Sequence, residues 1–170
     1  MQESILQNMQ SCCVRRAQAR RRDPVIVEAT RPKKYGDLMY ADHMVLLKPT
    51  EVGRDGERNV FCLLDWNSDF AGALPVDSKG TDHAAGAFEY ICGPDLIPRL
   101  FYTDGSKELR KLGKCYGLAH AKSTPYRPNA NARIEIFNYY ATLGTAQVLE
   151  QSGFGHEFWP QAMLYWTVAR

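Results

Sequence analysis

Apolar and polar residues alternate in two different periods along this chain, and each period predicts a different kind of element. Short apolar runs bounded by turn-forming residues predict strands at 38–47, 59–66, 69–76, 98–103 and 117–121. Apolar residues three or four positions apart predict helices at about 78–90, 106–114, about 131–150, and from near His156 to residue 170. Ser78 is the expected N-cap of the first helix. The turn-rich segment 48–57 and the proline-containing segment 122–130 are expected to be loops.

The expected order of elements is β-β-β-α-β-α-β-α-α, which predicts an α/β fold. The first three strands are joined by short turns and should therefore be antiparallel. The last two strands each follow a helix and should be parallel to the first strand. We therefore predict a mixed five-stranded sheet flanked by helices, with Pro75 at an edge or a strand end.

Residues 1–34 differ from the rest of the chain in charge and pattern. They contain eight basic and three acidic residues, whereas residues 35–170 contain 13 basic and 16 acidic residues. We interpret 1–34 as a basic arm and linker, and 35–170 as one globular domain. A basic arm on a mildly acidic body favours a polyanionic partner. A solvated tail that also serves as a nuclear-import signal is an equally good and compatible interpretation.

Composition excludes several classes of protein. The chain has 170 residues, enough for one domain with its own core and a tail. No apolar run approaches the roughly 20 residues that a membrane-spanning helix needs. The five cysteines lack the spacing of a disulfide framework, which favours free thiols in a reducing compartment.

Three carboxylates stand at positions that favour chemistry. Asp42 lies inside the first predicted strand, where an unpartnered carboxylate would be costly to bury. Asp104 follows the fourth strand, and α/β sheets place ligands beyond such strand ends. Glu135 lies in the first turns of the long helix. Each acid alone is more commonly a surface or capping residue.

The long helix carries two stripes of residues at helical spacing. The apolar stripe, which we expect to pack on the sheet, comprises Ile134, Phe137, Ala141, Gly144 and Val148. The polar stripe comprises Asn131, Glu135, Asn138 and Thr142. If the polar stripe faces the ends of the first and fourth strands, the three carboxylates can converge. Such oxygen ligands suit Mg²⁺, and two ions about 3.5–4 Å apart can promote phosphodiester cleavage.

Three sequence motifs, with a fourth after them, occur in an order that resembles retroviral and retrotransposon integrases. The run TDGSKEL (103–109) resembles the family's second-aspartate motif, and STPYRPNANARIE (123–135) resembles the motif that ends on its catalytic glutamate. The run YGDLMYADHM (35–44) resembles the first-aspartate motif, and FWPQAM (158–163) resembles a motif of copia-type elements. The resemblance spans about residues 35–168.

This resemblance implies an RNase H-like fold, two Mg²⁺ or Mn²⁺ ions, and DNA strand transfer in the nucleus. It makes Asp42, Asp104 and Glu135 the catalytic metal ligands. It also implies a homodimer that acts on retroelement ends and target DNA, with no membrane. The expected nucleic-acid-binding residues are Tyr126, Arg127, Asn129, Asn131, Lys122, Arg20, Arg21 and Arg22. His120 stands where the family often has a histidine, although a hydrogen-bonded histidine at a strand end is the more ordinary interpretation.

The segment MQSCCVRRAQARRR (9–22) resembles the tail of the zinc module that precedes integrase cores. Arg15 stands where its second cysteine belongs, and no histidine precedes it. A structural zinc site needs four ligands, so we expect no zinc.

Other functions remain open at this point. Departures from the family pattern at Asn129, Ala132 and Ile136, together with the incomplete zinc module, favour a nucleic-acid-binding remnant without catalysis. A dimerisation domain and a ribonuclease H acting on RNA–DNA hybrids are less favoured alternatives.

Overall fold

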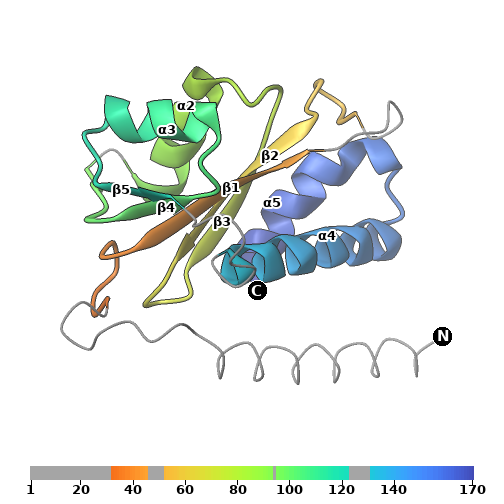
Figure 1. The fold of residues 1–170 in the computed structure, drawn as a ribbon. Helices are drawn as coiled ribbons and strands as arrows, with labels where there is room; N and C mark the ends of the chain where they lie inside the picture. The colour runs from red at the N-terminus through yellow and green to blue at the C-terminus, as the bar shows by residue number, and fades with distance from the viewer. Residues whose placement is uncertain (1–31, 46–51, 94, 123–130) are drawn as a thin grey trace.

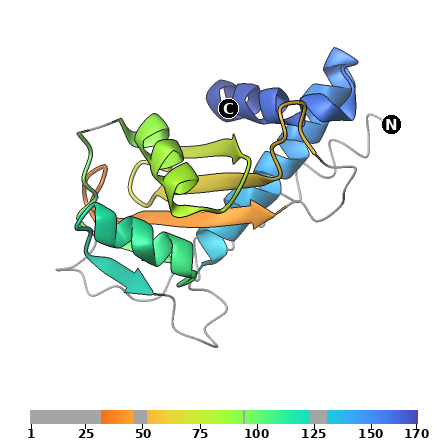
Figure 2. The same ribbon diagram turned by 90° about the horizontal axis from the view of Figure 1, so that it is seen from above.

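The computed structural model describes residues 32–45, 52–93, 95–122 and 131–170. A mixed β-sheet lies between two helical layers, with α2 and α3 on one face and α4 and α5 on the other (Figures 1 and 2). The predicted α/β class, with a mixed sheet flanked by helices, is confirmed. The basic arm lies outside the described residues, except for its last three residues.

The strands pair in the order β3-β2-β1-β4-β5. Their bounds are β1 Met39–Val45, β2 Asn59–Asp65, β3 Ala71–Val76, β4 Phe101–Thr103 and β5 His120–Lys122. The pairs β1–β2 and β2–β3 are antiparallel, and the pairs β1–β4 and β4–β5 are parallel. The predicted strand directions are therefore confirmed. Pro75 lies in the edge strand β3, where its missing N–H removes no hydrogen bond from the sheet interior.

The helices follow the predicted order. Their bounds are α2 Thr81–Cys92, α3 Lys107–Cys115, α4 Ala132–Ser152 and α5 Trp159–Ala169. A short 3-10 helix, η3 His156–Phe158, precedes α5. The last α-helix therefore begins three residues later than His156, at a turn where Pro160 needs no hydrogen-bond donor.

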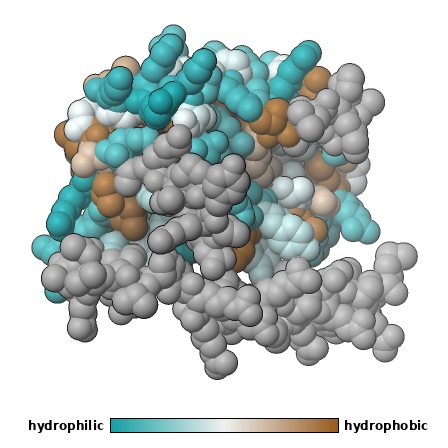
Figure 3. Space-filling view, in the orientation of Figure 1, coloured by the Kyte–Doolittle hydropathy of each residue, from teal (hydrophilic) through white to brown (hydrophobic). Residues whose placement is uncertain are grey.

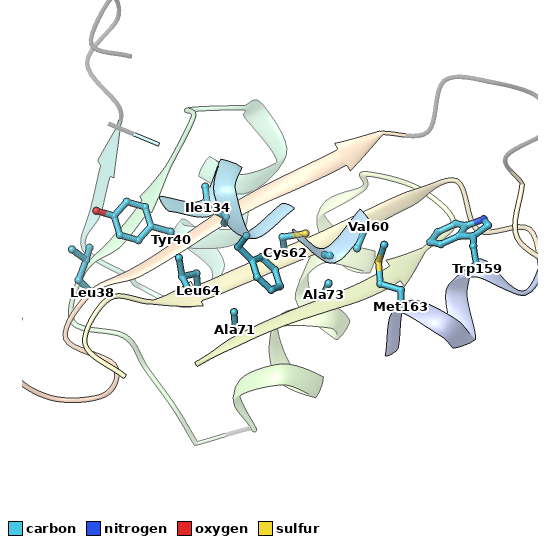
Figure 4. Packing of buried hydrophobic residues seen from close by; sticks show 12 residues of the cluster. Leu38, Tyr40, Val60, Cys62, Leu64, Ala71, Ala73, Ile134, Trp159 and Met163 are labelled. Atoms are coloured by element: carbon cyan, nitrogen blue, oxygen red, sulfur yellow. The ribbon is translucent and has the colours of Figure 1, made fainter. Parts of the chain in front are cut away.

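The sheet separates two hydrophobic cores, because successive side chains of a strand point to opposite faces. Under α4 and α5, the core contains Tyr40, Cys62 and Leu64 with Ile134 and Phe137 (Figure 4). The other face buries the intervening strand residues beneath α2 and α3; this core includes Met39, Phe61, Leu63, Phe88, Leu109 and Leu112. β2 is buried along its whole length, as expected of a strand covered on both faces.

α4 and α5 approach closely at Gly144. A Cβ atom there would collide with the Nε1 atom of the Trp166 ring. Gly144 belongs to the apolar stripe of α4, and Ile134, Phe137, Ala141 and Gly144 are all buried. These residues of the predicted stripe thus pack against the sheet and α5.

The fourth strand begins at Phe101, three residues later than predicted. Two other element ends also differ from the predictions. Ser78 does not cap α2: the N-cap is Gly80, and the Ser78 hydroxyl instead accepts a hydrogen bond from the Gly80 N–H at 3.2 Å. The last strand begins at His120, not residue 117, because the preceding residues close α3. Gly117 has a φ of 62°, and the Leu118 N–H bonds the Gly113 carbonyl at 2.8 Å.

Within the described part of the chain, no helix is both long and apolar enough to cross a membrane. The cysteines described there, Cys62, Cys92 and Cys115, are free thiols.

Candidate functional site

Asp42 lies in β1, which pairs with both β2 and β4. Its carboxylate accepts two hydrogen bonds, from the Asn138 amide at 2.9 Å and from the backbone N–H of His43 at 2.8 Å. The Asn138 bond joins β1 to α4 across 96 positions of the sequence. The half-buried carboxylate therefore has a hydrogen-bond partner, which comes from the predicted polar stripe.

The surroundings of Asp42 raise its pKa to about 6. Burial is the largest cause, because it penalises the charged form, and the charges of Asp104 and Glu135 raise the pKa further. The two hydrogen bonds, from His43 and Asn138, act in the opposite direction. Asp42 therefore carries an electrostatic strain at neutral pH that a nearby cation would relieve.

Asp104 follows β4 directly, one position beyond the pair formed by Ala41 and Thr103. Parallel pairing thus brings the backbones of Asp42 and Asp104 alongside each other. The Ser106 N–H donates to the Asp104 carboxylate at 2.9 Å, and Gly105 supplies the turn with a φ of 84°. Ser106 also caps α3, since its hydroxyl accepts a hydrogen bond from the Leu109 N–H.

Glu135 lies in the first turn of α4, and its side chain is exposed. Two further members of its polar stripe contact β1: Asn138 bonds Asp42, and the Thr142 hydroxyl lies 3.9 Å from the Met44 sulfur. These two contacts place the polar stripe beside β1.

Asp42, Asp104 and Glu135 come from three elements and interact electrostatically, but they do not meet around one point. Among the described residues, no three His, Cys, Asp or Glu side chains are gathered closely enough to hold one metal ion. The three carboxylates can interact without forming such a cluster, because charge interactions extend beyond metal–ligand distances and like charges repel. Asp104 and Glu135 are both exposed. An all-oxygen set with excess negative charge fits a hard divalent cation.

His120 is hydrogen bonded within the sheet. Its Nε2 atom lies 2.9 Å from the hydroxyl oxygen of the fully buried Thr103, which also accepts a hydrogen bond from the Gly105 N–H at 3.1 Å. Burial lowers the pKa of His120, and the charge of Arg110 lowers it further. His120 is therefore explained by the ordinary interpretation, a hydrogen-bonded histidine at a strand end.

Three buried polar atoms close to the candidate site have no hydrogen-bond partner: His43 Nε2, Asn131 Oδ1 and Asn138 Oδ1. The Asn138 amide directs its nitrogen to Asp42, so its oxygen remains available for a donor. Asn131 occupies the N-cap of α4 without a capping side-chain bond, and its backbone carbonyl accepts the Glu135 N–H at 3.0 Å.

Most of the other residues expected to bind nucleic acid lie outside the described part of the chain. Lys122 ends β5, and its neighbour in the next strand is Thr103. Six of the expected contacts lie outside the described residues: Tyr126, Arg127, Asn129, Arg20, Arg21 and Arg22.

The exposed side of α3 is a basic surface that the sequence predictions did not single out. The four exposed cations are Lys107, Arg110, Lys111 and Lys114, and we call them the α3 basic face. Hydrophilic side chains cover the region of α2 and α3 in Figure 3. Within the described residues, none of the four forms an ion pair. The last three cations lie three, four and seven positions after Lys107, a spacing that places all four on one side of a helix. This spacing could have predicted the surface from the sequence.

Asn138 was grouped with the polar stripe but not among the expected functional residues. Its position, three residues after Glu135, places both side chains on neighbouring parts of one helical face.

Comparison with models of known protein families gives no match, and no curated protein matches the chain.

Proposed function

We propose that this chain is the catalytic core of a retrotransposon-type integrase, in which Asp42, Asp104 and Glu135 bind two Mg²⁺ or Mn²⁺ ions. Its reaction would be phosphodiester cleavage followed by DNA strand transfer during integration of a retroelement in the nucleus. A homodimer and an RNase H-like fold belong to the same proposal. The strand order β3-β2-β1-β4-β5, with antiparallel pairs followed by parallel pairs, supports that fold.

The observation that carries the proposal is the placement of three carboxylates from separate elements at one end of the β1–β4 pair. Parallel pairing sets Asp104 beside Asp42, and the bond from Asn138 to Asp42 holds the helix that carries Glu135 against the same strand. The charges of Asp104 and Glu135 both act on Asp42, which is half-buried, whereas the other two are exposed. A purely structural carboxylate would gain from a cationic partner, whereas Asp42 has two acidic neighbours and two hydrogen-bond donors. This arrangement favours metal binding over a structural salt bridge.

Divalent ions bound there would activate the attacking oxygen and stabilise the leaving oxygen of a phosphodiester. The protein's own groups would position the ligands. Asn138 orients the Asp42 carboxylate, and the Ser106 N–H orients that of Asp104. The Asn138 oxygen is buried without a hydrogen-bond partner and would accept a hydrogen bond from a water molecule enclosed at the site.

A nucleic-acid-binding protein without catalysis is the second candidate, and the α3 basic face favours it specifically. Its four exposed cations outnumber the one acidic residue of α3, Glu108. Such a surface binds phosphates through charge, with little dependence on sequence. In an active integrase the same surface would hold DNA beside Asp104, because α3 begins three residues after that carboxylate.

The experiment that separates these candidates is reversal of strand transfer on a preformed branched DNA, with Mg²⁺ or Mn²⁺. The variants are Glu135→Gln and, as a matched control on an exposed position of the same helix, Glu150→Gln. An active core resolves the branched DNA with metal, loses this activity in Glu135→Gln and keeps it in Glu150→Gln.

The opposite result would be no resolution while DNA binding is retained and unchanged by Glu135→Gln. With a complete integrase scoring positive alongside, that result would overturn the catalytic proposal and leave the nucleic-acid-binding protein.

A further inference from the structure

Arg133 forms three contacts with the turn between β2 and β3. Its guanidinium donates to the Trp66 carbonyl at 3.0 Å and to the Asp69 carboxylate at 2.6 Å. Its central carbon also lies 4.1 Å from the centre of the Trp66 ring. A planar guanidinium that bonds at its edges and stacks on its face has little freedom to rotate. The first turn of α4 is therefore fixed in both position and rotation.

The contact continues from Trp66 through the aromatic residues of the neighbouring strands. The Trp66 ring stacks on the Tyr40 ring with centres 5.9 Å apart, and the Tyr40 and Tyr102 rings are 5.1 Å apart. We call the series Arg133, Trp66, Tyr40 and Tyr102 the ring stack. It connects α4, the end of β2, β1 and β4.

The ring stack has a fixed relationship to the three carboxylates. Tyr40 lies two residues before Asp42, Tyr102 lies two residues before Asp104, and Arg133 lies two residues before Glu135. Tyr40 and Tyr102 are direct partners in the parallel pairing of β1 and β4. On each of the three elements, a member of the ring stack therefore lies two residues before the carboxylate.

The turn that receives Arg133 is itself strongly fixed. The buried Asp65 carboxylate accepts hydrogen bonds from the N–H groups of Gly36, Asn67 and Ser68 at 2.9, 3.1 and 2.8 Å. Asp69 has a φ of 58°, an uncommon conformation for a residue other than glycine. The ion pair with Arg133 is partly exposed, with side-chain exposures of 21% and 38%. Such pairs add little stability, so orientation is the larger effect expected of this contact.

We propose that Arg133 is a positioning residue, which acts through the ring stack to set Glu135 relative to Asp42 and Asp104. The inference rests on the proposed function, because it takes these carboxylates to be the metal ligands. Arg133 itself contacts the turn, not the carboxylates. Its removal should therefore loosen the start of α4 and weaken metal binding without abolishing the fold.

Three variants of the full chain test this role. Arg133→Gln removes the charge and the stacked guanidinium, whereas Arg133→Lys keeps a charge for Asp69 without the planar fork. Asp69→Asn removes the ion pair but keeps the stack and the bond to the Trp66 carbonyl. The matched control is Arg54→Gln, since the Arg54 guanidinium also lies over a ring, Phe158, at 5.2 Å.

Two readouts are measured on each variant. The first, without metal, is amide hydrogen exchange at residues 134–138 compared with β1 and β2. The second is the Mn²⁺ concentration that gives half-maximal binding, measured by electron paramagnetic resonance. In Arg133→Gln we expect faster exchange confined to the start of α4 and about 10-fold weaker Mn²⁺ binding, the size typical of removing a residue that orients metal ligands. Arg133→Lys should recover part of the Mn²⁺ binding, and Asp69→Asn should weaken Mn²⁺ binding less than Arg133→Gln does. Arg54→Gln should bind Mn²⁺ as the unaltered chain does.

The two readouts keep this inference separate from the proposed function. If the unaltered chain binds no Mn²⁺, the metal-site proposal fails, and exchange at 134–138 alone decides whether Arg133 positions α4. The positioning role is overturned if exchange at 134–138 in Arg133→Gln equals that of the unaltered chain. It is also overturned if Mn²⁺ binds and its half-maximal concentration is the same in both.

Discussion

The Asn138 amide donates a hydrogen bond to the Asp42 carboxylate at 2.9 Å, and this bond joins the central strand to the long helix. It is one side-chain contact between the elements that carry Asp42 and Glu135, another being that of Thr142 with Met44. The bond also assigns the amide orientation, because the reverse orientation would place two oxygens against each other. The charge state of Asp42 and the position of α4 are therefore linked through one side chain.

Replacement of Asp42 by Asn should stabilise the chain in a chelating buffer at pH 8. The pKa of Asp42 in the folded chain is about 6, above the ordinary 3.8, so the folded state binds the proton more tightly. The contribution of Asp42 to the free energy of unfolding is most favourable below pH 4, where the carboxyl is protonated. It is lost as the pH rises through 6. Asp42→Asn should therefore raise the free energy of unfolding by about 1–3 kcal/mol at pH 8 and much less at pH 4. Urea denaturation at both pH values checks this, and an equal difference at both would contradict the buried carboxylate as its source.

Removal of the Asn138 amide should raise the pKa of Asp42 above its present value, since a donor to the charged form is removed. Asn138→Ala should also weaken divalent metal binding by about 10-fold or more. Carbon-detected NMR titration of the Asp42 carboxyl measures the first effect, and calorimetry with Mg²⁺ measures the second. Thr142→Ala, one turn further along the same stripe, is the control. An unchanged Asp42 titration in Asn138→Ala would show that the hydrogen bond has no role in the charge state.

Two glycine-to-alanine substitutions should have opposite signs. Gly144→Ala forces a Cβ into the Trp166 ring and should destabilise the chain by about 1–3 kcal/mol. Gly86 lies on the exposed side of α2, and a Cβ there meets nothing within 4 Å. Gly86→Ala should therefore stabilise the chain by about 0.5–1 kcal/mol. Thermal unfolding of both variants tests the packing of α5 on α4, and a neutral Gly144→Ala would mean that the two helices do not approach as described.

Charge reversal on the α3 basic face should weaken DNA binding in a salt-dependent way. Lys111→Glu with Lys114→Glu should lower affinity for duplexes of unrelated sequence to a similar extent. The slope of log affinity against log salt should become shallower, by about 0.9 for each phosphate that the variant no longer neutralises. Fluorescence anisotropy in EDTA at several salt concentrations measures both. Arg99→Glu, before β4 and at the opposite end of that strand from Asp104, is the control. An equal decrease in Arg99→Glu would assign the effect to net charge alone.

The period of apolar residues was sufficient to predict the α/β class, the order of elements and the strand directions. Each of these depends on local information: alternation along a strand, helical spacing, and the length of a connection. Asp42 and Asp104 also stood out by position, because a carboxylate within an apolar strand is costly to bury and the end of such a strand is a common ligand site. Two of the wrongly predicted element ends depend on glycine geometry and capping, at residues 78–80 and 117–118. Several local arrangements compete at each of these places.

The sequence by itself determined which residues are buried strands, which helical face is polar, and where unusual carboxylates occur. Only the tertiary structure decided that Asn138 meets Asp42, that Arg133 lies over Trp66, and that the α3 cations have no ion-pair partners among the described residues. Burial patterns follow from the free energy of transferring side chains from water, which each residue carries with it. A hydrogen bond or a stacked guanidinium depends on the relative position of groups about 65 to 96 residues apart, and that position is set by packing of the whole domain.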